Sequence, residues 1–237
     1  MNPLPIRDRG YANPDLLAET DWLADRLSDS NLLVIDARFP KGYAAGHIPG
    51  AVNLNGFGAI PRADNGDMAE PDEFGTLVGS LGVSEDMTVV VYDDPSQMAG
   101  MVAWAFMYYG HSDVRILDGG LAKWTTEGRP ISTEVPEYPS TQYIAKPVES
   151  VYCSLEHAKS AANKPNTVFW DTRTVGEFEG TEKGWDPPPR LGRIPGAVHL
   201  HWEDMIDPDI KTLMPANELS ALLMSRGITP ESEINTY

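Results

Sequence analysis

The sequence predicts an α/β fold with two related domains, each built on a mainly parallel sheet. Short apolar segments alternate with amphipathic ones along most of the 237 residues, which is the pattern of strand–helix units with parallel strands. A segment near the N-terminus, 34–52, is also repeated at 169–198, and both copies carry Asp-x-Arg followed by Gly-x-Ile-Pro-Gly-Ala-Val. A repeat at this separation indicates two domains rather than a solenoid, whose repeats are far shorter.

Hydrophobic periodicity assigns the elements of the first domain in chain order. Helices are expected where apolar residues recur at helical spacing, at Leu16–Leu27, Gly42–Gly46 (a short turn), Glu70–Gly82, Met98–Tyr109 and Leu121–Thr126. Strands are expected at short apolar or β-branched runs, at Leu32–Ile35, Thr88–Tyr92 and Val114–Leu117, and a further short strand is expected where the segment Ile48–Val52 leads on. In the second domain the same patterns predict helices at Ser154–Ala162 and Glu218–Ser225, and strands at Thr167–Trp170 and Glu233–Tyr237.

The domain boundaries follow from the repeat and from a change in composition. Residues 1–135 form the first domain and residues 151–237 belong to the second. Between them, residues 136–150 are proline-containing, lack any period and are predicted to be the interdomain linker. The second copy also holds an insertion at Glu179–Leu191, whose glycines and prolines predict an irregular loop.

The repeat also shows how far the second domain extends in this sequence. Tyr92 of the first copy corresponds to Tyr237, and the counterpart of Asp93 would be the following position. The first domain continues after Asp93 with a helix, a strand and a further helix. Without their counterparts, the second domain would expose apolar surface and strand edges. We therefore expect the second domain to be incomplete here and the sequence to be part of a longer protein.

Composition and charge narrow the class of protein. The chain is 41% hydrophobic and 22% charged, which is typical of a globular protein. Its net charge of −17 argues against nucleic acid as a partner, and an anionic substrate would need a locally positive pocket. With one cysteine, Cys153, an intramolecular disulfide is impossible. The N-terminus lacks the apolar core of a signal peptide and no apolar run could span a bilayer, so a cytoplasmic location without membrane attachment is expected.

Several separated motifs occur in an order that resembles a known family. They are the Asp-x-Arg and Gly-His-Ile-Pro-Gly-Ala pattern, then Val-Val-Val-Tyr-Asp, then Leu-Asp-Gly-Gly-Leu-x-x-Trp. Together they resemble the tandem-domain rhodaneses, the thiosulfate and 3-mercaptopyruvate sulfurtransferases. The resemblance implies two rhodanese-like domains, each with a five-stranded, mainly parallel sheet flanked by helices. It also implies a small anionic sulfur donor, a thiol or cyanide as acceptor, and no cofactor.

In this family a cysteine directly after the central strand of the C-terminal domain is the nucleophile. By resemblance, that cysteine would follow Tyr237, so no catalytic residue is expected within the sequence itself. The first domain has Asp93 at this position, which resembles the family's inactive domain. A carboxylate cannot accept sulfur and repels an anionic donor. A thiolate in a loop that leads into a helix would be stabilised by backbone N–H groups and by the helix dipole.

Three residues of the second domain are candidates for substrate binding. Asp171 and Arg173 follow a predicted strand at the edge where α/β sheets bind ligands, although Asp36 and Arg38 repeat them and favour a structural ion pair. Arg193 replaces His47 of the first copy and is either a substrate contact or a solvated arginine. Weaker candidates of the same kind are Lys183, Trp185 and Arg190 in the insertion. Glu177 departs from the family, because some members carry a substrate-binding arginine at this position.

The remaining reactive side chains are assigned structural roles. His199 and His201 have a His-x-His spacing, but they correspond to Asn53 and Asn55, so a strand edge is expected and no metal site is predicted. Cys153 precedes a helix away from the nucleophile position and is expected to pack.

Two functions of different classes remain open from the sequence. The leading one is a sulfurtransferase that acts through a cysteine persulfide, and the alternative is a non-catalytic rhodanese-like protein that binds a partner or a small anion. A phosphatase on the same fold would need a cysteine with an arginine six residues later, which nothing in the sequence supplies. The choice between thiosulfate and 3-mercaptopyruvate cannot be made from these residues.

Overall fold

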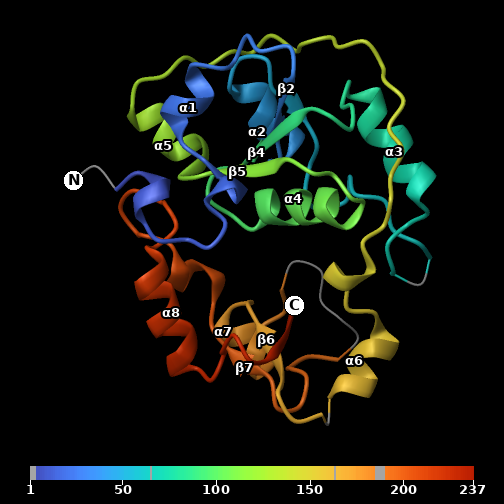
Figure 1. The fold of residues 1–237 in the computed structure, drawn as a ribbon, viewed down its shortest axis with the longest axis vertical. Helices are drawn as coiled ribbons and strands as arrows, with labels where there is room; N and C mark the ends of the chain where they lie inside the picture. The colour runs from blue at the N-terminus through green and yellow to red at the C-terminus, as the bar shows by residue number, and fades with distance from the viewer. Residues whose placement is uncertain (1–3, 65, 163, 185–189) are drawn as a thin grey trace. The chain divides into compact units, whose positions relative to one another are not determined.

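A computed structural model describes residues 4–64, 66–162, 164–184 and 190–237. The contacts divide the chain into two units. Unit 1 comprises Met1–Tyr152 with Asp209–Thr212, and unit 2 comprises Cys153–Pro208 with Leu213–Tyr237. Each unit contains one copy of the repeated segment, with strands and helices in the same order (Figure 1).

Unit 1 is organised by a five-stranded parallel sheet in the order β1-β5-β4-β2-β3. This confirms the predicted sheet for the first domain. The strands are β1 (Leu17–Ala18), β2 (Leu32–Asp36), β3 (Val52–Asn53), β4 (Thr88–Tyr92) and β5 (Val114–Leu117). The helices are α1 (Thr20–Ala24), α2 (Pro40–Ala45), α3 (Pro71–Ser80), α4 (Met98–Tyr108) and α5 (Gly120–Thr126), with short 3-10 helices at Ile6–Asp8, Pro14–Leu16 and Glu149–Val151.

The core of unit 1 lies on both faces of the central strand β4. Val89 and Val91 face a cluster completed by α3 and α4, whereas Val90 faces a second cluster completed by α1 and α5. All three valines are fully buried. Figure 1 shows α4 on one side of the sheet and α1 and α5 on the other. A strand covered on both faces explains why β4 is a continuous β-branched run.

One predicted helix in unit 1 was wrong. Residues Leu16–Leu27 were expected to be helical throughout, but α1 begins only at Thr20 and Leu17–Ala18 forms the strand β1. Ala18 pairs with Leu117 of β5, and its carbonyl accepts a hydrogen bond from the N–H of Asp118 (3.0 Å). Pairing with a strand a hundred residues later overrides the local apolar period, which carries no information about such partners.

The segment predicted as an interdomain linker packs along unit 1. Thr141 N–H donates to the carbonyl of Gly79 (2.9 Å), and Lys146 N–H donates to the carbonyl of Tyr109 (2.9 Å). The contacts group this whole segment with unit 1. We call residues 132–148 the strap. Glycines on α3 allow its close approach, because a Cβ atom on Gly79 would lie 2.6 Å from the carbonyl oxygen of Thr141.

Unit 2 repeats the first half of this architecture. Its three-stranded parallel sheet has the order β7-β6-β8, from β6 (Thr167–Asp171), β7 (Val198–His199) and β8 (Glu233–Thr236). The helices are α6 (Leu155–Ala161), α7 (Val175–Glu179) and α8 (Ala216–Ser225), with a 3-10 helix at Trp202–Met205. Within the described residues β8 pairs only with β6, whereas its counterpart β4 is paired on both sides.

Burial differs accordingly between the two units. Residues 89–92 of β4 are buried, but none of the residues of β8 and none of α8 is buried. The predicted incompleteness of the second domain stays a prediction. As for membranes, none of the helices in the described ranges is both long and apolar enough to cross one.

We expect Gly79→Ala to destabilise unit 1 by about 1–3 kcal/mol, because the added methyl group overlaps the strap carbonyl of Thr141 and the packed backbone must shift. Urea unfolding followed by tryptophan fluorescence measures the change. Gly100→Ala in α4 is the matched control, since a Cβ atom there meets nothing within 4 Å and alanine favours a helix. Equal effects of the two substitutions would contradict a tightly packed strap.

Candidate active site

The candidate site lies at the carboxyl edge of each sheet, where β2 and β4 end in unit 1 and β6 and β8 end in unit 2. Asp36 pairs with Tyr92 in the register of β2 and β4. In unit 2 the register runs to Trp170 and Thr236, and the N–H of Tyr237 donates to the carbonyl of Trp170 (3.1 Å). Tyr237 therefore occupies the place of Tyr92, as the repeat predicts.

In unit 1 a buried carboxylate ties the edge together. Asp36 is fully buried and accepts hydrogen bonds from Arg38 Nη2 (2.6 Å) and from the hydroxyl of Tyr92 (2.6 Å). Arg38 Nη2 also donates to the carbonyl of Gly46 (2.7 Å), and Ile48 N–H donates to the Tyr92 hydroxyl oxygen (3.0 Å). The Gly-x-Ile-Pro-Gly turn is thus fixed to the ends of two strands.

Unit 2 contains the same network at the corresponding residues. Arg173 Nη2 donates to Asp171 Oδ2 (2.6 Å) and to the carbonyl of Gly192 (2.8 Å), and Ile194 N–H donates to the Tyr237 hydroxyl oxygen (3.1 Å). Tyr237 also hydrogen-bonds to the Asp171 carboxylate. Burial opposes ionisation of Asp171, but the hydrogen bonds from Arg173 and Tyr237 outweigh it and lower its pKa. Asp171 is therefore a carboxylate at neutral pH.

This geometry assigns Asp171 and Arg173 a structural contribution, because each bonds to the other. The Asp171 side chain is fully buried, whereas Arg173 keeps 25% of its side chain exposed. A substrate could therefore reach Arg173 but not Asp171. Their roles in substrate binding stay predictions.

Asp93 lies directly after β4, at the position where the sequence resemblance implies a nucleophile in the second domain. Its Oδ2 atom accepts hydrogen bonds from Ser96 Oγ (2.7 Å) and from the N–H of Ala99 in the first turn of α4 (2.9 Å). Burial raises the pKa of the carboxyl group, and these hydrogen bonds oppose the rise only in part. The Asp93 side chain thus takes up the hydrogen-bond donors at the start of α4.

A contact that the sequence did not predict closes this loop from the other side. The carbonyl of Asp93 accepts a hydrogen bond from the N–H of Leu121 (2.8 Å) at the start of α5. A Cβ atom on Gly120 would lie 2.4 Å from that carbonyl oxygen. Gly119 and Gly120 are adjacent in the sequence. Adjacent glycines were the signal that another part of the backbone approaches closely.

Arg193 lies on the surface of unit 2 above an aromatic ring. Its guanidinium lies 4.3 Å from the centroid of the Phe178 ring, and Nη1 donates to the carbonyl of Phe178 (3.3 Å). In unit 1 the corresponding His47 stacks on Tyr43 (3.9 Å between centroids) but is fully buried beneath the strap. Both residues pack against an aromatic ring, but only the arginine has its side chain exposed to solvent.

The weaker candidates and Glu177 lie in or just before the insertion of unit 2. Lys183 and Arg190 are exposed, and Trp185 lies outside the described residues. Glu177 accepts hydrogen bonds from the N–H (3.2 Å) and the hydroxyl (2.9 Å) of Thr174, so it caps the start of α7.

The other reactive side chains contact neighbouring residues of unit 2. His199 Nε2 bonds to the carbonyl of Arg173 (2.8 Å), and His201 packs edge-on against Trp202. Over the described ranges, no three His, Cys, Asp or Glu residues are placed to hold a metal ion. Cys153 is half-buried, and burial raises its thiol pKa, which disfavours a thiolate.

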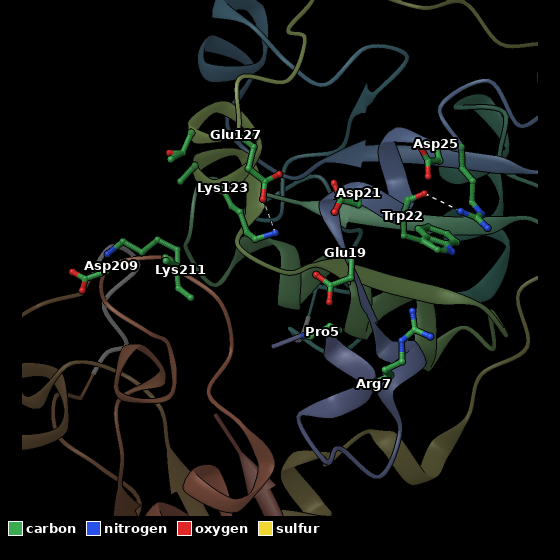
Figure 2. A pocket seen from close by; sticks show the side chains of 14 residues that line it. Pro5, Arg7, Glu19, Asp21, Trp22, Asp25, Lys123, Glu127, Asp209 and Lys211 are labelled. Atoms are coloured by element: carbon green, nitrogen blue, oxygen red, sulfur yellow. Dashed lines mark hydrogen bonds and ion pairs between the residues drawn. The ribbon is translucent and has the colours of Figure 1, made fainter. Parts of the chain in front are cut away.

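A pocket of about 520 Å³ lies elsewhere in unit 1, beside α1 and α5 (Figure 2). Charged side chains of both signs line it, and Lys123 forms an ion pair with Glu127 there (2.9 Å). None of the predicted site residues contributes to it. The pocket therefore adds nothing to the chemistry of the sheet edge.

The burial of Asp93 is expected to make the stability of unit 1 depend on pH. Its folded-state pKa lies above the unfolded value, so its contribution to stability is largest at low pH and declines as pH rises through the folded pKa. We expect the unfolding free energy of Asp93→Asn, which keeps an oxygen acceptor, to rise relative to that of the unsubstituted chain as the pH increases from 4 to 8. Asp94→Asn removes the same charge from an exposed neighbour and should show a smaller change. Parallel pH profiles for Asp93→Asn and the unsubstituted chain would contradict the assignment.

Comparison with known protein sequences identifies relatives along nearly the whole chain. Residues 19–127 match the rhodanese-like domain family. The sulfur carrier protein TtuD of Thermus thermophilus is 35% identical, over 96% of this chain and 84% of that protein. The thiosulfate sulfurtransferase of Corynebacterium glutamicum is 34% identical, over 88% of this chain and 72% of that protein.

Solved structures agree with this assignment. SseA from Escherichia coli, described as a 3-mercaptopyruvate sulfotransferase with a rhodanese fold, superposes with a TM-score of 0.82 at 25% identity, over 93% of this chain and 87% of its own. EanB superposes with a TM-score of 0.82 at 22% identity, over 95% of this chain, but this chain spans only 60% of EanB. The second likeness shows the fold alone. The repeated sheet edge and the similarity to these proteins together show that the chain belongs to the rhodanese family.

Proposed function

We propose that this protein is a sulfurtransferase that moves a sulfane sulfur from thiosulfate or 3-mercaptopyruvate to a thiol or cyanide. The persulfide would form on a cysteine directly after Tyr237. The observation that carries the proposal is that Tyr237 holds the position of Tyr92, the residue before Asp93 in unit 1. Relatives named thiosulfate sulfurtransferase and 3-mercaptopyruvate sulfotransferase support the choice of donor.

Asp93 indicates what such a loop offers to an anion. Its carboxylate receives one hydroxyl and one backbone N–H at the start of an eleven-residue helix. A cysteine in an equivalent loop would receive similar donors and the positive end of a helix dipole. These donors favour the thiolate over the thiol, which lowers the thiol pKa and provides the nucleophile at neutral pH.

The reaction then proceeds in two displacements. The thiolate attacks the outer sulfur of thiosulfate, a new S–S bond forms, the original S–S bond breaks, and sulfite leaves with the electron pair. An acceptor nucleophile next attacks the terminal sulfur of the persulfide and releases the thiolate. Cyanide leaves as thiocyanate, and a thiolate acceptor leaves as a persulfide. With 3-mercaptopyruvate, a C–S bond breaks in the first step and the carbon takes up a proton to give pyruvate. Such covalent relay gives ping-pong kinetics.

Arg193 and Arg173 supply the positive charge that an anionic donor needs in a chain of net charge −17. In this proposal Arg193 contacts the anionic group of the donor from its exposed position over Phe178. Arg173, held by Asp171, contributes its remaining exposed side-chain surface. Asp171 acts through Arg173 and the strand end.

A sulfur carrier is a second candidate, favoured by the relative named as such. It would use the same persulfide but deliver the sulfur to a thiol on another protein. Comparing the rates of sulfur transfer to a protein thiol and to cyanide tests this candidate, because a carrier passes its sulfur to the protein thiol in preference to cyanide.

The persulfide can be tested on protein produced from the complete coding sequence. Incubation with thiosulfate or 3-mercaptopyruvate should increase the intact mass by one sulfur atom, and cyanide should remove that sulfur as thiocyanate. Replacing the cysteine after Tyr237 by serine should abolish both, whereas Cys153→Ser should not. A residue other than cysteine at that position, or no adduct with either donor, would reject the sulfurtransferase. The remaining function would then be the non-catalytic rhodanese-like protein that binds a partner or a small anion.

Arg193 can be tested separately through the Michaelis constant. We expect Arg193→Gln to raise KM for thiosulfate about threefold to tenfold with little change in kcat, because a partly exposed charge contact contributes about 1 kcal/mol. Arg226→Gln, at the exposed end of α8, is the control for loss of one positive charge. If the KM of Arg193→Gln equals that of Arg226→Gln, Arg193 is a surface residue without a substrate contact.

A further inference from the structure

Two histidines are buried among the described residues of unit 1, and both bond to the strap. His47 lies beneath the start of the strap, and its Nε2 atom bonds to the carbonyl of Glu134 (3.0 Å). His111 follows α4, and its Nδ1 atom bonds to the hydroxyl of Tyr143 (3.3 Å). Histidine is the side chain that ordinarily changes its charge between pH 5 and 8, so protons can act on this contact.

The hydrogen bonds of His111 fit a neutral ring. Its Nε2 atom lies 3.0 Å from the carbonyl oxygen of Met87, which can only accept, so Nε2 carries the proton. The Nδ1 atom then accepts from the hydroxyl of Tyr143, which bonds to no other group in the described part of the chain. If Nδ1 gains a proton, that hydroxyl can no longer donate to it, and a buried ring becomes charged. Both changes weaken the contact between His111 and the strap.

The titratable groups that face His111 come from three parts of unit 1. The strap contributes Tyr143, the residue before β5 is Asp113, and the turn between α3 and β4 contributes Glu85. Both carboxylates already have donors, because Asp113 bonds to Arg115 (2.8 Å) and Glu85 accepts from a strap N–H (2.7 Å). Burial outweighs the attraction of these carboxylates and lowers the pKa of His111.

The contacts of His47 respond to a proton in the opposite sense. Its Nδ1 atom lies 2.9 Å from the carbonyl oxygen of Tyr43, and its Nε2 atom bonds to that of Glu134. A neutral ring can donate to only one of these carbonyls, whereas a protonated ring donates to both. The titratable group that faces this ring is Tyr43, which stacks on it (3.9 Å between centroids). Acid therefore does not weaken this end of the strap, where the backbone of His47 also pairs with that of Ser132.

We propose that His111 and Tyr143 form an acid-sensitive latch, which releases the second half of the strap, residues 141–148, when His111 takes up a proton. Once the segment opens, water reaches His111 and the ring regains its ordinary proton affinity. Because its pKa in the closed state is lowered, the latch is fully stable above about pH 6.5 and weakens as the pH falls toward the closed-state pKa. Opening uncovers the ring of Phe74, on which Tyr143 packs edge-on (6.0 Å between centroids). The latch is independent of the proposed sulfur transfer.

Amide hydrogen exchange of the full chain, corrected for the intrinsic exchange rate at each pH, measures the opening. The amides of Thr141 and Lys146, which bond to α3 and to the end of α4, should lose protection about threefold to tenfold between pH 7 and pH 5. The amide of Ser132, which bonds to the carbonyl of His47 (2.9 Å), should lose none. The amides of β4 should stay more protected than those of the strap, which shows that the opening is local.

His111→Gln, whose side chain cannot change its charge, should remove the pH dependence at Thr141 and Lys146. His157→Gln is the matched control and should keep it, because His157 is exposed in unit 2, where it contacts Glu233. Constant protection of the two strap amides between pH 7 and pH 5 would overturn the proposal. An equal loss at Ser132, or an unchanged pH dependence in His111→Gln, would also overturn it. If His111→Gln does not fold, the comparison of the two ends of the strap in the unsubstituted chain decides.

Discussion

The structure depends on a buried carboxylate at the end of a parallel strand. Asp36 and Asp171 are both fully buried, and an unpaired charge in such a place would cost several kcal/mol. Each is compensated by an arginine two residues later, which also reaches a glycine carbonyl, and by a tyrosine at the end of the neighbouring strand. Because the arginine reaches a separate turn and the tyrosine ends a separate strand, satisfying one charge fixes two strand ends and a turn together.

This constraint also fixes where the loop after the strand begins. The network defines where the strand carrying the tyrosine ends, and the chain must leave the sheet at that point. In unit 1 the next residue, Asp93, receives donors from Ser96 and from the first turn of α4. Helix N-termini favour negative charge irrespective of its chemistry, so the same geometry accommodates a carboxylate or a thiolate. In the proposed function, whether such a domain transfers sulfur then depends on the side chain that follows the strand.

The network was accessible to sequence analysis because its residues are repeated at fixed positions. The two copies predicted the strand ends, the ion pairs and the correspondence of Tyr92 with Tyr237. By contrast, β1 and the strap could not be predicted, because their hydrogen bonds run to Leu117, Gly79 and Tyr109, which no local period reports. The contacts around Asp93 were missed for the same reason, since Leu121 approaches from a helix that begins well after the loop.

The two edges differ most in what they leave available to solvent. In unit 1 His47 bonds to the carbonyls of Tyr43 and Glu134 and is buried, so that copy uses this position for its own packing. In unit 2 Arg193 takes the same place on an aromatic ring but keeps its charge at the surface. The copy that carries the buried Asp93 is thus also the copy that has covered its histidine. A positive charge costs little at an exposed edge and is useful only where an anion must approach, which is the requirement of a sulfur donor in so acidic a chain.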